Sequence, residues 1–348
     1  MKAKVLFASV RLLLSLAFLF ALAPLGRLPV QASALEGTIA YIVSNQPNGD
    51  EIHLIEPDGS GDRVLFRTNN PLPENFADIM SLAWKPDASE LAFASGHEYL
   101  CSLYNMDIYA IRANGEDYRR VTDPPACGAR AGLPTGTVIV PVYNANTYAG
   151  PFFIYFEGAP SAKPVSLAPG GGPLMVTFEN VADYGDVEQS AVYITKDGRF
   201  TYAGAHLNVI PGETLTTNPV YMTKGVPKFG WYWPSYLQDG SKISTIFTGQ
   251  DVFTFESNNR EPGFHGDEKL NFKFLMSGSE LSWGPTPELA NKFLYWGDWQ
   301  DSQYYMHGSI FLGDITNGSK EMLVDADPNQ DGNILLGYSW LPDGSGFL

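Results

Sequence analysis

A short unit that recurs along the chain constrains the fold more than any other feature of the sequence. A full unit opens with an aromatic residue and a Pro- or Asp-containing turn, and it continues into short apolar runs. The opening residues are Trp84 and Asp87 in one unit, Tyr236, Asp239 and Gly240 in another, Trp283 in a third, and Trp340, Asp343 and Gly344 in the last. Repeats of this kind predict an array in which each unit buries its apolar side chains against its neighbours.

The segments between these openings predict strands rather than helices. Runs of four to eight residues rich in Ile, Val, Tyr, Phe and Thr alternate with Asp-Gly, Asn-Gly and Pro turns, and no sustained helical period follows residue 35. With 35 Gly, 25 Pro and 44% apolar residues, the chain is rich in turns and still has side chains for a large core. We therefore expect an all-β protein.

The two ends of the chain carry complementary halves of the unit. Residues 38–65 contain only the closing half and residues 338–348 only the opening half. In a ring of radial sheets, the two halves complete one sheet and leave no long exposed edge. This predicts a β-propeller of about six blades, closed by N- and C-terminal strands that share a blade. A chain that stops inside a further blade would show the same pattern.

The best-preserved unit resembles the WD-like propeller repeats of the TolB type. The matching residues are Trp84-Lys-Pro-Asp87, Asp107-Ile-Tyr109, Asn114-Gly115 and Arg120-Val-Thr122, and the resemblance covers about 36–125 and 228–348. Ala88 stands where Gly is usual in that pattern. The resemblance implies a scaffolding role and identifies no partner.

The repeat pattern is interrupted between residues 134 and 226. Alternating apolar and polar residues with Gly and Pro turns predict an inserted β-sandwich of about seven short strands. The segment is weakly similar to immunoglobulin-like or prealbumin-like accessory domains, and two degenerate blades are the alternative. The expected domains are a signal peptide (1–34), an N-terminal propeller segment (35–133), the insertion (134–226) and a C-terminal propeller segment (227–348).

The first 34 residues have the pattern of a bacterial secretory signal. Lys2, Lys4 and Arg11 precede an apolar run, 12–25, that is shorter than the roughly 20 residues of a membrane span. Small residues then allow cleavage after Ala32 or Ala34. We expect a secreted, periplasmic or cell-envelope protein without stable membrane insertion after signal removal, and an uncleaved anchor is the alternative.

The charge of the chain restricts its partners. Removal of residues 1–34 takes away four of the 22 Lys and Arg residues and none of the 38 Asp and Glu residues, which leaves a net charge of −20. Such a field repels nucleic acid and anionic membranes, whereas divalent cations and basic surfaces are favoured. We expect a monomer that binds a protein or glycan partner.

The two cysteines, Cys101 and Cys127, flank the end of one unit. In an oxidising compartment they are expected to form a disulfide, because a folded-back set of strands brings its ends together. Two separate buried thiols are the alternative.

One loop spaces oxygen side chains as a calcium site does. Asp327, Asn329 and Asp331 occupy alternate positions before a Gly, and Asp325 lies upstream. Tyr338 takes the place of the usual bidentate carboxylate, so the loop is either a possible Ca²⁺ site or a solvated turn. We expect no required cofactor.

Two aromatic clusters are candidates for a ligand-binding face that stacks on sugar rings. Their residues are Trp231, Trp233, Trp296 and Trp299. Propeller strands also bury aromatic side chains routinely, so core packing is the favoured alternative.

No catalytic motif is present in the sequence. It contains no Gly-x-Ser-x-Gly elbow, no P-loop, and no metal spacing among its five histidines. We therefore expect a non-enzymatic scaffold. A carbohydrate-active propeller enzyme, a glycoside hydrolase or lyase that uses a pair of carboxylates, is the alternative.

Overall fold

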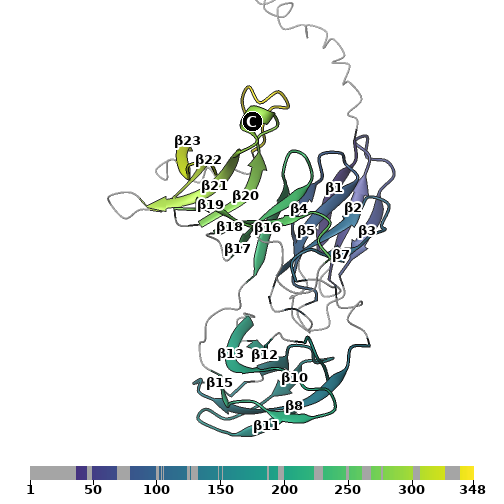
Figure 1. Ribbon diagram of the computed structural model, residues 1–348, viewed down its shortest axis with the longest axis vertical. Helices are drawn as coiled ribbons and strands as arrows, with labels where there is room; N and C mark the ends of the chain where they lie inside the picture. Colours follow the sequence, from purple (N-terminus) through teal and green to yellow (C-terminus); the bar gives the residue numbers. More distant parts are fainter. Residues whose placement is uncertain are drawn as a thin grey trace, which may run out of the picture.

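The protein is built from β-sheets joined by turns, as a computed structural model shows (Figure 1). The all-β prediction is confirmed. The structure describes residues 37–44, 49–68, 79–98, 102, 104, 106–123, 126, 132–147, 149–150, 152–185, 188–194, 200–222, 230–247, 251–260, 268–275, 277–300, 306–325 and 338–348.

Four antiparallel sheets lie outside the middle segment, and the strands in each follow chain order. The first contains β1 (Ile39–Ser44), β2 (Asp50–Ile55) and β3 (Arg63–Arg67). The second contains β4 (Ile79–Trp84), β5 (Glu90–Ser95), β6 (Asp107–Arg112) and β7 (Arg119–Arg120). The third contains β16 (Trp231–Tyr236), β17 (Lys242–Phe247), β18 (Asp251–Glu256) and β19 (Glu268–Lys273). The fourth contains β20 (Ser277–Trp283), β21 (Lys292–Gln300), β22 (Met306–Asp314) and β23 (Ser319–Asp325), with the 3₁₀ helix η3 (Pro287–Leu289) between β20 and β21.

The repeat aromatics occupy corresponding places in these sheets. Trp84, Tyr236 and Trp283 are the last residues of β4, β16 and β20, the first strands of their sheets. Trp340 forms a bridge with Phe347, seven residues later, just as Trp84 pairs with Leu91. The recurrent sequence pattern therefore marks one recurrent structural position.

The turn that follows the aromatic residue also recurs. Asp87 accepts hydrogen bonds from the backbone N–H and the hydroxyl of Ser89, at 3.0 and 2.6 Å. Asp239 and Asp343 accept the same pair of bonds from Ser241 and Ser345. These bonds hold the turn closed between the first two strands of each unit.

Each later aromatic residue donates a hydrogen bond into the preceding sheet. The Tyr236 hydroxyl donates to Glu90 Oε1 at 2.6 Å, and Trp283 Nε1 donates to Ser244 Oγ at 2.8 Å. Trp340 Nε1 donates to the Ser282 carbonyl at 2.9 Å. The repeat position thus connects the third sheet to the second, the fourth sheet to the third, and the C-terminal segment to the fourth sheet.

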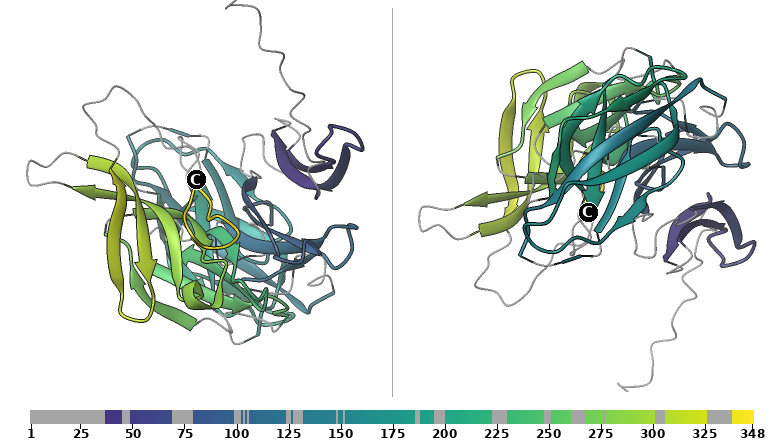
Figure 2. Two further views of the ribbon diagram at one scale, coloured as in Figure 1. Left: turned by 90° about the horizontal axis from the view of Figure 1, so that it is seen from above. Right: turned by 90° about the horizontal axis from the view of Figure 1, so that it is seen from below.

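The four sheets follow one another in chain order, and the first strands of neighbouring sheets are in contact. Strand β4 contacts β1 and β16, and β16 contacts β20. Seen from above, the sheets lie around the C-terminal segment, residues 338–348 (Figure 2). The described residues thus contain four such sheets, and the number of six blades stays a prediction.

The C-terminal segment pairs with itself in the described part of the chain. Leu341 N–H donates to Gly346 O at 2.8 Å, and Ser339 and Leu348 exchange backbone hydrogen bonds. The sheet of β1, β2 and β3 has no fourth strand among the described residues. The blade shared by the two ends of the chain stays a prediction.

The middle segment forms two further sheets. One has the order β10 (Lys163–Val165), β9 (Phe152–Phe156), β12 (Gln189–Ile194) and β13 (Phe200–Leu207). In the other, β8 (Thr135–Asn144) pairs antiparallel with β11 (Leu174–Ala182) and parallel with β14 (Thr214–Thr216) and β15 (Val220–Met222). Side chains of both sheets share one core, which includes Val140, Ile154, Phe156, Phe178 and Ala205.

In the described part of the chain, no helix has the length and apolar character that crossing a membrane requires.

Replacing Ala88 by glycine is expected to stabilise the protein. Ala88 has φ 56°, and the corresponding Gly240 and Gly344 have φ 68° and 71°. Relief of about 1–2 kcal/mol of left-handed strain outweighs about 0.4–1 kcal/mol of extra entropy in the unfolded chain. The free energy of unfolding in urea should rise by about 0.5–1 kcal/mol. Ala290→Gly, at an ordinary φ of −58°, is the control and should lower it; a loss of stability in Ala88→Gly would contradict the turn geometry.

Candidate functional site

Two of the first strands carry a strained residue at the same position. Trp233 has φ 56° and Glu280 has φ 52°, and each lies three residues before the repeat aromatic of its strand. The strand register slips at both positions, between Tyr232 and Ser235 and between Ser279 and Ser282. A left-handed conformation is costly for residues with a side chain, and such strain persists mainly where the surrounding structure imposes it, often at binding sites.

Both strained residues line one cavity of about 820 Å³. Its walls are formed by residues 80–84 of β4, 233–236 of β16 and 280–285 of β20 and the turn after it. Ile42 of β1 and Tyr338 and Ser339 of the C-terminal segment also line it. The first strands of all four sheets and the last described segment of the chain therefore meet at this one cavity.

The cavity is lined by aromatic, aliphatic and uncharged polar residues, more of its lining surface is polar than apolar, and it has few charges. Trp84, Trp233, Trp283 and Tyr338 contribute rings, and Glu280 is the one ionisable carboxylate among its described lining residues. Glu280 is exposed to solvent. A concave site that combines aromatic side chains with polar groups suits ligand binding.

Tyr338 holds the strained segment of β20 in place. Its hydroxyl donates to the Ser279 carbonyl at 2.8 Å and lies close to the Glu280 carbonyl. It also accepts a hydrogen bond from the Trp296 backbone N–H at 2.7 Å. Tyr338 of the C-terminal segment thus provides a hydrogen-bond partner for backbone groups that the bulge leaves without a strand partner. This holds Glu280 at the cavity wall.

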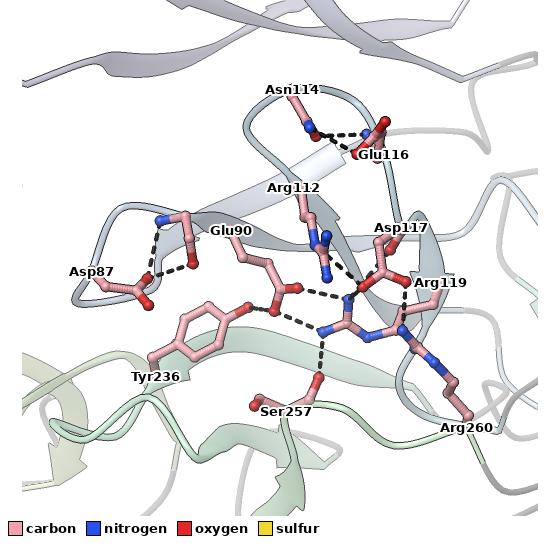
Figure 3. Close-up of polar contacts among 11 residues, drawn as sticks. Asp87, Glu90, Arg112, Asn114, Glu116, Asp117, Arg119, Tyr236, Ser257 and Arg260 are labelled. Carbon is pink, nitrogen blue, oxygen red and sulfur yellow. Dashed lines mark hydrogen bonds and ion pairs between the residues drawn. The ribbon is translucent and has the colours of Figure 1, made fainter.

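A buried ion pair ties the second and third sheets together beside the cavity (Figure 3). Arg119 donates two hydrogen bonds to Glu90, both at 2.7 Å, and the hydroxyl of Tyr236 donates to the same carboxylate. Burial raises the pKa of Glu90, but the bonds from Arg119 and Tyr236 outweigh it, so the pKa is lowered. Arg119 also donates to the Ser257 carbonyl across the sheet interface. These hydrogen bonds join the two sheets, although Arg119 Nε has no partner among the described residues.

A second buried cluster lies at the opposite end of the second sheet. Burial raises the pKa of Asp107 to about 6, and it lowers that of His97 to about 3. Asp107 accepts a hydrogen bond from Thr122 at 2.8 Å, and Arg120 Nη1 lies 3.9 Å from it. His97 contacts Ser95 and the hydroxyl of Tyr118, each at 2.9 Å. Such perturbed groups often mark functional sites, but Asp107 and His97 are both enclosed, and each is hydrogen-bonded to its own neighbours, which indicates a structural role.

A network of polar and ionisable side chains extends across the first sheet. Arg67 bonds to Glu51 at 2.8 Å, and the two ring nitrogens of His53 lie 3.0 Å from Glu51 and from Asp62. Tyr41 donates to Asp62 at 2.9 Å. Partial burial lowers the pKa of His53, but the hydrogen bonds to the two carboxylates raise it further, so the pKa is raised overall.

The predicted aromatic residues are dispersed. Trp231 is fully buried between the second and third sheets, against Phe247 and Phe255, so its ring is part of the core and not of an accessible ligand face. Trp233 lines the cavity. Trp296 packs closely over Gly308, and the side chain of Trp299 lies outside the described residues.

The metal and disulfide predictions fall mainly on undescribed residues. Asp325 is exposed at the end of β23 and accepts a hydrogen bond from Ser309 at 3.3 Å. Asp327, Asn329 and Asp331 lie outside the described residues, as do Cys101 and Cys127. Within the described part, no group of three or more His, Cys, Asp or Glu side chains is arranged to hold a metal ion. The Ca²⁺ site and the disulfide stay predictions.

Sequence reasoning missed Glu280 and Tyr338 as site residues. The spacing of Trp233 and Glu280 from the repeat aromatics is visible in the sequence, since each lies three residues upstream. Their left-handed conformation is not visible, because neither residue type favours it. Glu90 and Arg119 are 29 residues apart, and only the folded sheet brings them together.

The chain is structurally similar to β-propeller proteins at low sequence identity. No known protein-family model matches it. TolB from Acinetobacter baumannii is 13% identical with a TM-score of 0.30, over 84% of this chain and 54% of that one. Oligogalacturonate lyase from Vibrio parahaemolyticus is 7% identical with a TM-score of 0.26, over 89% and 82% of the two chains. The chain thus spans about half the length of the TolB structure, and these similarities say nothing about its activity.

Removing the hydroxyl of Tyr236 is expected to weaken the junction between the second and third sheets. Tyr236→Phe takes one hydrogen bond from the buried Glu90 carboxylate, which costs about 1–2 kcal/mol. Urea denaturation measures the loss. Tyr41→Phe, which removes an exposed hydroxyl–carboxylate bond, is the matched control and should cost less than about 0.5 kcal/mol. Equal losses in the two variants would contradict this role.

The stabilisation by His53 is expected to depend on pH. Because its folded pKa is raised, its contribution is fully present below the unfolded pKa of about 6.5 and is lost as the pH rises through the folded value. His53→Gln should therefore destabilise the protein at pH 5.5 more than at pH 9, as measured by urea unfolding. Asp62→Asn should reduce that difference, since it removes one of the two carboxylates. A pH-independent effect of His53→Gln would refute the linkage.

Proposed function

We propose that the protein is a non-enzymatic binding scaffold that takes a basic side chain of a protein partner into the central cavity. The observation that carries this proposal is the composition of the cavity wall, in which several aromatic residues and a single described carboxylate, Glu280, line the same cavity. Aromatic faces and a carboxylate together attract an Arg or Lys side chain. The strain at Trp233 and Glu280 fixes both residues before the ligand arrives.

The charge of the whole chain supports the same type of partner. With 38 acidic and 22 basic residues, the protein attracts basic surfaces over long distances and repels anionic ones. The cavity provides the local contacts with the basic side chain, and the negative field of the whole protein increases the rate at which a basic partner associates.

We also propose an architecture for the chain. The four sheets are blades of a propeller around the cavity, and residues 134–226 are an inserted β-sandwich. The shared core of the two middle sheets supports the sandwich, since two degenerate blades would each pack against neighbouring sheets. The meeting of the first strands at one cavity supports the radial arrangement.

The proposal also places the protein outside the cytoplasm. The basic start, the short apolar run 12–25 and the small residues at 30–34 support export to the envelope or the extracellular space.

A displayed peptide library tests the cavity. Peptides selected on the mature chain at physiological salt should contain Arg or Lys next to apolar residues. Their affinity should fall at least ten-fold for Glu280→Gln, which removes the charge, and for Trp233→Gly, which removes the ring and suits the left-handed backbone. Glu321→Gln, an exposed carboxylate on β23, is the matched control and should leave affinity unchanged.

Two results would contradict the proposal. The first is peptide binding that is unaffected by either cavity variant, because the site would then lie elsewhere. The second is turnover of chromogenic glycosides that is lost in Glu280→Gln, because this would make the cavity the active site of a carbohydrate-active enzyme.

A further inference from the structure

The middle segment exposes one sheet face of unusual composition. Along β8, the side chains alternate between the core and the outside, with Val138, Val140 and Val142 fully buried. Successive side chains of a strand point to opposite faces, so the residues between these valines point outward. The outward residues of β8 are Thr137, Ile139, Pro141 and Tyr143.

The strand register places the neighbours of these residues on the same face. On β11, Met175 pairs with Pro141 and Thr177 with Ile139. On β14 and β15, Thr214, Thr216 and Tyr221 pair with Thr137, Ile139 and Tyr143, respectively. We call these nine residues the neutral face; they are Thr137, Ile139, Pro141, Tyr143, Met175, Thr177, Thr214, Thr216 and Tyr221.

The neutral face contains no Asp, Glu, Lys, Arg or His among its nine members. The acidic residues Glu179 and Glu213 lie at its Thr137 end, next to the β11 bulge and the start of β14. In a chain with 38 acidic residues, a surface of several strands without ionised side chains is unexpected for a face that only meets water. Figure 1 shows β8, β11 and β15 at the far end of the molecule from the four sheets of the cavity, so those sheets do not cover this face.

Two tyrosines form a platform on this face. The rings of Tyr143 and Tyr221 are stacked, with centroids 4.9 Å apart and planes inclined by 14°. Tyr221 remains 56% exposed and Met175 52% exposed. Exposed aromatic and apolar side chains that form a contiguous patch mark an interaction site more often than scattered ones do. Four threonines, Thr137, Thr177, Thr214 and Thr216, lie at the other end of the same face, around Ile139, and add donors and acceptors.

We propose that the neutral face binds a neutral polysaccharide chain. The apolar face of one pyranose ring stacks on an exposed tyrosine ring, and the hydroxyl groups of sugar units further along the polysaccharide exchange hydrogen bonds with the threonine side chains. The net negative charge of the chain favours a neutral ligand on this face. A basic protein would bind the acidic surfaces elsewhere on the chain, and an anionic polymer would be repelled. The site is separate from the cavity and does not depend on the function proposed for it.

Affinity electrophoresis of the mature chain tests the proposal. Native gels are cast with one neutral polysaccharide each, namely hydroxyethylcellulose, xylan, galactomannan or glycol chitin, and a parallel gel contains the anionic polymer alginate. At least one neutral gel should retard the protein, and alginate should not. Tyr221→Ala should weaken the retardation at least ten-fold, while Tyr221→Phe, which keeps the ring, should retain it. Leu275→Ala, an exposed apolar residue outside this face, is the matched control and should bind like the parent.

Three outcomes would overturn the proposal. In the first, none of the neutral polymers retards the chain. In the second, retardation occurs but is unchanged in Tyr221→Ala, or is equally strong with alginate. In the third, sedimentation equilibrium shows a dimer that Tyr221→Lys dissociates, which would assign the neutral face to a second copy of this chain.

Discussion

The structure outside the middle segment depends on one recurrent contact, in which the aromatic residue at the end of a sheet's first strand donates a hydrogen bond into the preceding sheet. Tyr236 reaches Glu90, Trp283 reaches Ser244, and Trp340 reaches the Ser282 carbonyl. A buried donor that lacks a partner is costly, so these bonds fix both the spacing and the order of the sheets. Two of these contacts link consecutive sheets, and the third links the C-terminal segment to the fourth sheet. They bring together segments that line the cavity.

The repeat pattern was sufficient to predict the class of fold and the positions of the strand openings. Trp84 and Tyr236 end their strands before turns in which an Asp lies three residues further on, and Trp283 ends its strand before Gly284 and Pro285. These turn residues are a local property of the sequence. The partners of these residues could not be predicted, because Glu90, Ser244 and Ser282 come from other units and carry no distinctive pattern. The same holds for the strain at Trp233 and Glu280, which comes from a register slip between strands and not from residue preference.

The aromatic clusters illustrate the limit of composition as a guide to function. Trp231 and Trp233 are two residues apart, so they point to the same side of an ideal strand, yet one is buried in the core and the other lines the cavity. The left-handed backbone at Trp233 separates them. The neutral face of the middle segment was missed for the opposite reason: its threonines and tyrosines are ordinary in sequence, and only the pairing of β8 with three strands assembles them into one uncharged surface.

The first and last described segments of the chain meet at one cavity, which Ile42 of β1 and Ser339 of the C-terminal segment both line. A photo-crosslinking residue at position 339, followed by mass spectrometry of the cross-linked peptides, tests this contact directly. If these segments line one cavity, residue 339 should form cross-links to β1 and β4 as well as to the adjacent β20. Cross-links confined to β20 and β21 would show that the first strands of the sheets do not converge, and they would contradict a cavity shared by both ends of the chain.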